Sequence, residues 1–263
     1  MKITANGITT RYELEGPATA PVVTLSHSLA ATLSLWDAQA AALRDRYRVL
    51  RYDVRGHGGS DVPPAPYTLE QMAGDLHGLL QALGIAETHF VGLSMGGLIG
   101  MTMALRFPRA IRSLVLADTT AAYGPERKPM WDDRIRDAET KGIDAVLDRT
   151  MDVWFTGPFR AARPDVIARI RAMMAPTSPV GYVGAIQAIG YGDLREDIRA
   201  IRCPTLILVG EEDHGTDITM ARTMHERIAG SELAVLPRTA HCSCVEAADA
   251  FNQALLAFLP RVG

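Results

Sequence analysis

The fold of this chain is decided by the stretch His89-Phe90-Val91-Gly92-Leu93-Ser94-Met95-Gly96-Gly97. A short apolar run leads into the pattern Gly-x-Ser-x-Gly, and small residues recur every four positions, at Gly96, Gly100 and Ala104. This spacing leaves one stripe of the following helix bare, so that the helix can lie close against strands. The pattern is typical of a nucleophile elbow, a sharp turn between a buried strand and a helix that presents the serine Oγ in a cleft. Ser94 is therefore the predicted nucleophile.

A serine nucleophile needs a base, and in the chain order that this turn implies the base comes after the acid. Residues 233–236 predict a late strand, and the loop that follows it carries His241. Of the seven histidines, only His241 lies just past a late strand in that order. We therefore predict His241 as the base and expect the other histidines, such as His57 and His214, to be solvated or structural.

Three adjacent acids compete to orient that histidine. Residues 204–210 predict a buried parallel strand, and Glu211, Glu212 and Asp213 follow at its carboxyl end, where α/β sheets bind ligands. Successive strand residues alternate between faces, so at most two of the acids face the same way. Asp213 is the predicted acid, because the turn after the strand is where a side chain reaches the histidine loop. Glu211 is the alternative, and we expect the unused acids to be solvated.

An acyl-transfer site also needs two backbone N–H groups that stabilise the developing charge on the carbonyl oxygen. One is expected from Met95, directly after the nucleophile, and the other from the loop after an early strand. Residues 22–26 predict that strand, so we assign the second donor to the backbone of Leu29. His27 lies in the same loop, where we expect its side chain to make a structural hydrogen bond.

The composition is that of an ordinary globular protein. A chain of 263 residues can bury one sizeable core, and contents of 48% hydrophobic and 22% charged residues are usual. The net charge of −3 comes without a basic patch, which disfavours nucleic-acid binding. The N-terminus lacks the apolar segment of a signal peptide, and no apolar run is long enough to span a bilayer. We therefore expect no membrane association and a cytoplasmic location.

The three cysteines, Cys203, Cys242 and Cys244, predict neither a disulfide framework nor a metal site. Their number is odd, and one residue separates the last two. A tetrahedral zinc site needs three or four clustered nitrogen or sulfur ligands, and the pair beside His241 lacks further partners of matching character. We expect no metal and no cofactor, and we interpret these cysteines as small apolar fillers.

Strands and helices alternate along residues 1–120 and again along 193–263. This alternation predicts an α/β core with a mostly parallel central sheet and helices on both faces. Residues 121–192 are instead helical in pattern and rich in arginine, aromatic residues and methionine, which is typical of a helical cap inserted over a cleft. We expect about a third of the cap's large apolar side chains to line the substrate pocket. The candidates are Trp131, Trp154, Phe155, Phe159, Met173, Met174 and Tyr182.

The chain resembles the α/β-hydrolase superfamily over nearly its whole length. The resemblance rests on the elbow, on the loop Asp53-Val54-Arg55-Gly56-His57-Gly58-Gly59-Ser60 and on residues 204–213. A serine at the nucleophile position argues against the haloalkane dehalogenase and epoxide hydrolase branches, which use aspartate there. Narrower motifs resemble 3-oxoadipate enol-lactonases of aromatic-acid catabolism, in the β-ketoadipate pathway. These motifs are Ser26-His27-Ser28-Leu29 with Trp36, Trp154-Phe155-Thr156 and Asp193-Leu194-Arg195.

The chain also departs from the enol-lactonase pattern in ways that bear on the substrate. Ala30 stands where that family commonly has glycine, and His214-Gly215 replaces the more usual turn after the acid. Cys242-Ser243-Cys244 follows His241 in place of a familiar sequence. None of these departures removes a predicted catalytic group.

We expect a serine hydrolase that opens a small lactone or ester, which is the small-molecule partner of the site. The resemblance implies 3-oxoadipate enol-lactone as that substrate. Another carboxylesterase, another lactonase or a carbon–carbon bond hydrolase of the same fold would use the same groups. A ligand receptor without turnover is the alternative from a different class, because a fold alone does not establish a function. The sequence does not indicate an oligomeric state.

A substrate with a free carboxylate needs a cationic partner when it enters an apolar cleft. Trp131 and Arg134 share a helix face at a spacing of three residues, so they are candidates to bind it, together with Trp154. Arg134 could also be a solvated surface charge, as most arginines of the cap must be. The other arginines of the cap considered for this role are Arg127, Arg136, Arg149 and Arg160.

Overall fold

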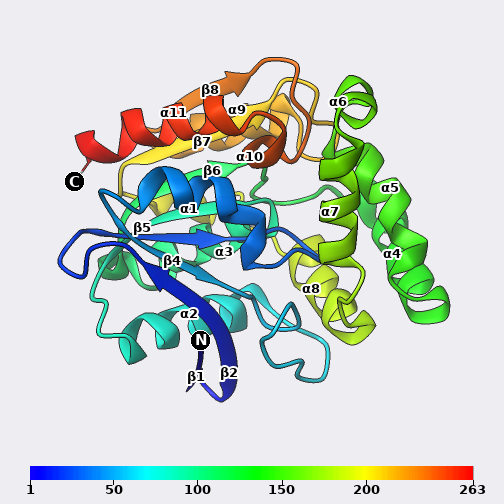
Figure 1. Cartoon of the computed structure of the whole chain (residues 1–263), viewed down its shortest axis with the longest axis horizontal. Helices are drawn as coiled ribbons and strands as arrows, with labels where there is room; N and C mark the ends of the chain where they lie inside the picture. Colours follow the sequence, from blue (N-terminus) through cyan, green and yellow to red (C-terminus); the bar gives the residue numbers. More distant parts are fainter. Residues whose placement is uncertain (263) are drawn as a thin grey trace.

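The computed structural model describes residues 1–262, and within them the strands form a single eight-stranded sheet (Figure 1). The strands are β1 (Lys2–Ala5), β2 (Ile8–Glu15), β3 (Val22–Ser26), β4 (Arg48–Tyr52), β5 (Thr88–Leu93), β6 (Ile111–Ala117), β7 (Thr205–Gly210) and β8 (Glu232–Leu236). Their order across the sheet is β1-β2-β4-β3-β5-β6-β7-β8. β2 pairs antiparallel with β1 and β4, and the other neighbouring pairs are parallel. The predicted α/β fold with a mostly parallel sheet is confirmed.

Helices cover both faces of this sheet. They are α1 (Asp37–Leu43), α2 (Leu69–Ala82), α3 (Met95–Arg106), α9 (Ile218–Arg227), α10 (Ser243–Glu246) and α11 (Ala248–Phe258). α1 packs against α11, and α2 packs against α3. In Figure 1 the first pair lies in front of the sheet and the second pair lies behind it.

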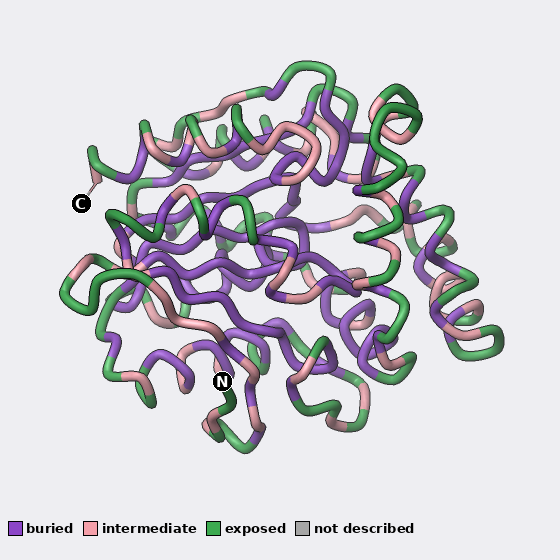
Figure 2. Tube along the Cα trace, viewed as in Figure 1, coloured by how far each residue is buried: buried purple, intermediate pink, exposed green. Residues whose placement is uncertain are grey.

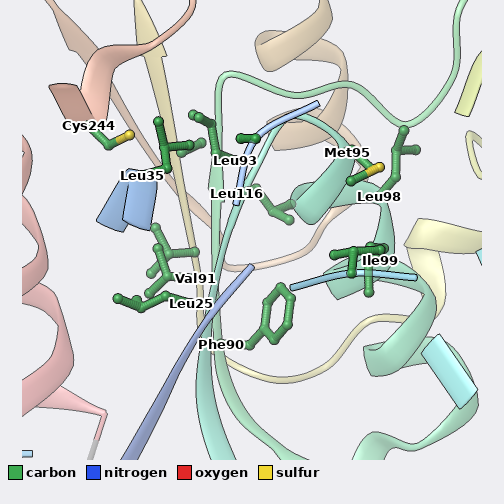
Figure 3. Packing of buried hydrophobic residues seen from close by; sticks show 14 of the residues in the cluster. Leu25, Leu35, Phe90, Val91, Leu93, Met95, Leu98, Ile99, Leu116 and Cys244 are labelled. Carbon is green, nitrogen blue, oxygen red and sulfur yellow. The ribbon is translucent and has the colours of Figure 1, made fainter. Parts of the chain in front are cut away.

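The buried core includes the contact of α3 with β5 and β6. Phe90 and Leu116 belong to the buried apolar cluster between these elements (Figure 3). The small residues of α3 face this contact, because a Cβ added to Gly96 would overlap the carbonyl oxygen of Ser26, and one added to Gly100 would overlap the Phe90 ring. The bare helix stripe predicted from the four-residue spacing is therefore present, and it brings α3 close enough to fix the turn before it.

A group of helices is inserted between β6 and β7. These inserted helices are α4 (Lys128–Lys141), α5 (Asp144–Trp154), α6 (Gly157–Ala162), α7 (Pro164–Met174) and α8 (Pro179–Tyr191). They gather at the end of the sheet to which the parallel strands point (Figure 1), and α4 packs against both α5 and α8. An isolated antiparallel bridge joins Ala122 to Asp193, where the chain leaves and re-enters the sheet region. The carboxyl ends of the parallel strands, where α/β sheets bind ligands, thus lie beneath the inserted helices.

Burial follows these layers (Figure 2). Every residue of β5 and β7 is buried, whereas α4 alternates between buried, half-buried and exposed positions. A helix with this alternation turns one apolar stripe inward and its charged residues toward solvent. None of the helices within residues 1–262 combines the length and the apolar character needed to cross a membrane.

Candidate active site

Ser94 occupies a strained turn between β5 and α3. Its backbone has φ 53° and ψ −110°, outside the regions that residues with a Cβ normally adopt. The turn is tight, because a Cβ on Gly92 would overlap the backbone of Gly96. The Ser94 N–H donates to the carbonyl oxygen of Ala117 at 2.9 Å, which ties the turn to the end of β6. Backbone strain held in place by surrounding packing is characteristic of functional sites.

His241 and Asp213 form a buried pair. The Nδ1 of His241 lies 2.9 Å from the Oδ2 of Asp213, and only 5% of the histidine and 2% of the aspartate are exposed. An Nδ1–H that donates to the carboxylate leaves Nε2 of the imidazole free to accept a proton. The structure therefore brings together the predicted base and the predicted acid in the relation that an orienting carboxylate requires.

The electrostatics of this pair favour an ionised carboxylate and a basic imidazole. Burial alone would raise the pKa of Asp213, but the attraction of His241 and hydrogen bonds from His241 and Thr216 outweigh it and hold that pKa below its usual range. Burial alone would likewise lower the pKa of His241, but the charge of Asp213 and its hydrogen bond outweigh burial and raise that pKa above its usual value. Each partner thus stabilises the charged form of the other.

The Asp213 carboxylate is also held by its own turn. The backbone N–H groups of Gly215 and Thr216 donate to Oδ1 at 2.7 and 2.9 Å, and the hydroxyl of Thr216 donates to Oδ2 at 2.8 Å. Such bonds from an aspartate to backbone N–H groups two and three residues ahead define an Asx-type turn. The sequence Asp-His-Gly-Thr carries that signal, so this support could have been found from the sequence.

The two neighbouring acids take no part in the pair. Glu211 and Glu212 are both exposed, and Glu211 accepts a hydrogen bond from the backbone N–H of Arg238 at 2.9 Å. The carboxyl group that reaches the histidine loop is thus the one in the turn, as predicted.

The expected oxyanion donors have free N–H groups. Leu29 lines the cavity beside Ser94, and among the described residues neither its N–H nor that of Met95 has a hydrogen-bond acceptor. Ala30, which stands where the resemblance predicts glycine, has φ 61°, a conformation that glycine enters without strain.

His27 braces this loop, as expected. Its Nδ1 bonds to the carbonyl oxygen of Ser28 at 2.8 Å, and its Nε2 accepts from the N–H of Val54 at 2.9 Å. Burial lowers the pKa of His27 to about 4, so the ring is neutral near pH 7 and can donate at one nitrogen while accepting at the other. The side chain links the loop after β3 to the loop after β4 and has a structural role.

A cavity of about 100 Å³ lies between the strand ends and the inserted helices. Ser94 and His241 both line it, with Ser28, Leu29, His214 and Gly215 on the side of the sheet. Four of the seven candidate large apolar residues line the cavity, more than the expected one third. The reason is that α4, α5, α7 and α8 each turn one such side chain inward. These are Trp131, Trp154, Met174 and Tyr182. The cavity is smaller than the pockets that hold drug-sized ligands, so it suits a small substrate.

Arg134 projects into this cavity from α4, with two arginines from neighbouring segments. Its guanidinium lies 5.5 Å from the Trp131 ring and donates to the hydroxyl of Thr150 at 3.1 Å, while its Nε is buried without a partner. The indole N–H of Trp131 and the hydroxyl of Tyr182 are also buried and unpartnered. Unused buried donors beside a cationic group are what an anionic ligand would satisfy. Arg127 and Arg149 line the cavity as well, whereas Arg136 and Arg160 pair with acids at the surface.

The loop that carries His241 is attached to the inserted helices. The N–H of Cys242 donates to the carbonyl oxygen of Trp154 at 2.9 Å. Glu246 accepts from the N–H of Thr156 at 3.0 Å with one oxygen and from the N–H of Ala240 at 2.8 Å with the other. Glu246 was not predicted from the sequence, since its partners lie in two separate segments.

One buried acid near the pair was also missed. Asp118 follows directly after β6 and is fully buried; its charge raises the pKa of His241, and the charge of Asp213 raises the pKa of Asp118 itself. An acid at the carboxyl end of a parallel strand, at the same sheet edge as Ser94 and Asp213, was the available signal.

No three histidine, cysteine, aspartate or glutamate side chains within residues 1–262 cluster as metal ligands would, and the three cysteines are free.

Comparison with known proteins gives consistent matches over the whole chain. A family model for the α/β-hydrolase fold matches residues 21–248. The 3-oxoadipate enol-lactonase 2 of Acinetobacter baylyi is 33% identical over 259 residues, which cover 98% of this chain and 96% of that protein.

Two solved structures are similar throughout. The enol-lactonase from Burkholderia xenovorans LB400 superposes with a TM-score of 0.95 at 38% identity and covers 99% of this chain and 100% of its own. A thermophilic esterase from Thermogutta terrifontis, with malate bound, gives a TM-score of 0.93 at 30% identity and covers 100% of this chain and 98% of its own.

Proposed function

Since this chain belongs to the α/β-hydrolase family, we propose that it hydrolyses the ring ester of a small lactone with a free carboxylate, 3-oxoadipate enol-lactone being the first candidate. The proposal is carried by one observation: Ser94, on its strained turn, and the hydrogen-bonded His241–Asp213 pair border the same cavity. The likeness to enol-lactonases, at 33% and 38% identity, supports the choice of substrate. The relatives are hydrolases, so a receptor without turnover is set aside. Residues 121–192 serve as the cap over the site.

The first half of the reaction acylates Ser94. The Oγ attacks the lactone carbonyl while its proton passes to Nε2 of His241, and Asp213 stabilises the imidazolium that forms. The carbonyl oxygen becomes an oxyanion, which accepts hydrogen bonds from the N–H groups of Leu29 and Met95. The ring C–O bond then breaks, and the leaving oxygen takes the proton from His241.

The second half releases the product. Water gives a proton to Nε2 of His241 and attacks the acyl carbon, and the same two N–H groups stabilise the second oxyanion. The bond to Oγ breaks, and Ser94 recovers its proton from the imidazolium. The organic product is an open-chain dicarboxylate, and neither half requires a group beyond this chain, the substrate and water.

The carboxylate of the substrate binds in the part of the cavity around Arg134. The unpartnered Nε of Arg134, indole N–H of Trp131 and hydroxyl of Tyr182 supply donors that would otherwise stay buried without acceptors. Trp154 forms an apolar wall on the side of His241, since the two rings are 6.4 Å apart. The malate-bound esterase is a relative that is recorded with a dicarboxylate, in line with an anionic ligand.

The deciding experiment compares turnover of 3-oxoadipate enol-lactone, other lactones, neutral short-chain esters and carbon–carbon bond substrates by the purified protein. Ser94→Ala should lower kcat on the order of 10⁴-fold while leaving the protein folded. A variant that kept more than about a tenth of the activity would exclude Ser94 as the nucleophile. Faster turnover of neutral esters than of carboxylated lactones would instead favour a carboxylesterase, the second candidate, which the 30% identity to the Thermogutta enzyme supports.

The anchoring role of Arg134 has its own test. Arg134→Ala should raise KM for carboxylated lactones about ten-fold and leave the KM of neutral esters nearly unchanged, because an anchor remote from the reacting atoms acts through binding. Arg136→Ala is the matched control, since Arg136 lies on the same helix but is exposed and paired with Asp133. Arg134 also lowers the pKa of His241, so the assays belong at a pH where the imidazole is neutral in both forms. Equal effects on charged and neutral substrates, or none on either, contradict the assignment.

A further inference from the structure

Three consecutive residues at the end of β6, Ala117 to Thr119, contact the segments that carry Ser94, Asp213 and His241. The carbonyl oxygen of Ala117 accepts from the N–H of Ser94 at 2.9 Å. The hydroxyl of Thr119 donates to the carbonyl oxygen of Ser94 at 2.7 Å. Between these two residues stands Asp118, whose N–H donates to Leu208 of β7 at 2.9 Å. The nucleophile turn is thus fixed to the same short segment from which the Asp118 side chain projects.

The Asp118 carboxylate joins two further segments. Its Oδ1 accepts from the N–H of Gly210, the last residue of β7, at 2.9 Å. Its Oδ2 accepts from both the N–H and the hydroxyl of Ser243, the former at 3.1 Å. Gly210 lies three positions before Asp213 in the sequence, and Ser243 lies two positions after His241. One carboxylate therefore ties the strand that carries the acid to the loop that carries the base.

The cost of keeping this acid buried indicates that it does more than fill space. Asp118 is fully buried, has φ 43°, and has no positively charged side chain among its hydrogen-bond partners. Burying a carboxylate without a cation is unfavourable, and a neutral hydrogen-bonding residue could satisfy the same N–H groups. Where Asp118 is ionised, its negative charge acts on the neighbouring titratable groups.

The charged and titratable groups around Asp118 come from the two segments that it joins. They are the Asp213 carboxylate beyond β7 and, on the histidine loop, the His241 imidazole and the Cys242 thiol. Burial first, and then repulsion from Asp213, raise the pKa of Asp118 to about 7, while His241 and the bonds from Ser243 and Gly210 oppose the rise. On His241 the charge of Asp118 acts in the same direction as that of Asp213, raising the imidazole pKa, whereas Arg134 lowers it.

We propose that Asp118 is a positioning residue for the hydrolytic reaction. Its bonds to Ser243 and Gly210 hold His241 and Asp213 in place relative to each other, and when it is ionised its negative charge adds to that of Asp213 in stabilising the imidazolium. Asp118 neither touches the substrate nor replaces Asp213 as the acid, since it accepts its bonds from Ser243 and Gly210 and not from the imidazole. The inference rests on the proposed function, because it assumes that His241 is the base.

The two contributions can be separated by two variants. Asp118→Asn removes the charge but keeps an oxygen that can accept a hydrogen bond, and Ser243→Ala keeps the charge but removes one hydrogen bond to it. Both should lower kcat roughly 10-fold with little change in KM, because a small displacement of the base slows the chemical step more than binding. Only Asp118→Asn should move the acid limb of the kcat/KM profile to lower pH, by about half a unit, because only that variant removes a negative charge near His241.

The experiment measures pH profiles of kcat and kcat/KM for the wild type, both variants and Ser94→Ala on one substrate, with thermal unfolding as the fold check. If Ser94→Ala is inactive but the other two variants keep the wild-type kcat and acid limb, Asp118 has no positioning role and the inference fails. If Ser94→Ala is active, the proposed function itself fails, which is a different result. If Asp118→Asn does not fold, the test rests on Ser243→Ala alone. An unchanged kcat in that variant overturns the inference. A lower kcat with unchanged KM and an unchanged acid limb supports it.

Discussion

Replacing Ser94 by glycine should make the folded protein more stable than replacing it by alanine. At φ 53° and ψ −110°, a residue with a Cβ is strained, and such strain costs about 1–3 kcal/mol. Glycine relieves the strain but loses more backbone entropy on folding, which costs about 0.5–1 kcal/mol relative to alanine. The difference favours glycine at this position by about 1 kcal/mol.

Both variants lack the Ser94 Oγ, so their comparison separates the effect of the backbone conformation from the loss of that hydroxyl. Urea unfolding should give Ser94→Gly a free energy of unfolding higher by about 1 kcal/mol, and thermal unfolding a Tm higher by about 2–4 °C for a chain of this size. Ala41→Gly is the control, because Ala41 is exposed in α1, where glycine should instead cost about 0.5–1 kcal/mol.

The reasoning is refuted if Ser94→Gly is less stable than Ser94→Ala by an amount similar to the loss at the control position. The turn would then store no strain, and its unusual dihedral angles would not mark an energetic cost of presenting the Ser94 side chain.

Three further outcomes are expected. Asp213→Asn should lower kcat roughly 10²- to 10⁴-fold by misorienting His241. Glu211→Gln and Glu212→Gln, at exposed carboxylates, should lower kcat far less. Reversed sensitivities in steady-state kinetics would assign the orienting role to a glutamate. The acid limb of the kcat/KM profile should have a pKa above the usual histidine value of about 6.5. Only the neutral imidazole accepts a proton, and Asp213 outweighs burial in setting the His241 pKa. A pH–rate profile whose acid limb has a pKa below that value would contradict this. Glu246→Gln should loosen the loop that carries His241 from the inserted helices, and so lower the Tm and lower kcat roughly 10-fold. Calorimetry and kinetics that match the wild type would exclude a role of Glu246 in joining the two segments.

The sequence predicted those parts of the molecule that depend on local pattern. The strand that leads to Ser94 and the bare stripe of α3 follow from apolar runs and from a four-residue spacing of small residues. The choice of Asp213 among three acids followed from the turn after β7, where only a residue beyond the strand end reaches the histidine loop. Such signals lie within one segment, so no knowledge of the tertiary arrangement was needed.

Contacts between distant segments could not be predicted in the same way. Asp118 and Ser243 are 125 positions apart, and Glu246 and Thr156 are 90 apart, so neither bond leaves a mark in the local pattern. The number of side chains from the inserted helices that line the cavity was underestimated for the same reason, since the inward face of each helix depends on how the helices pack together. For Arg134 the helical spacing predicted the stacking on Trp131, but not that its Nε is buried without a partner.

The loop that carries His241 is attached to residues 154–156, and this attachment limits which helical insertions could replace residues 121–192 without moving that loop. Enzymes with a separate lid can exchange it for another and so acquire a new specificity while the reacting groups stay as they were. Here a foreign lid would also replace the Trp154 carbonyl and the Thr156 N–H, which anchor Cys242 and Glu246. A chimera would therefore inherit an altered rate together with an altered substrate preference, unless the junction lay beyond residue 156.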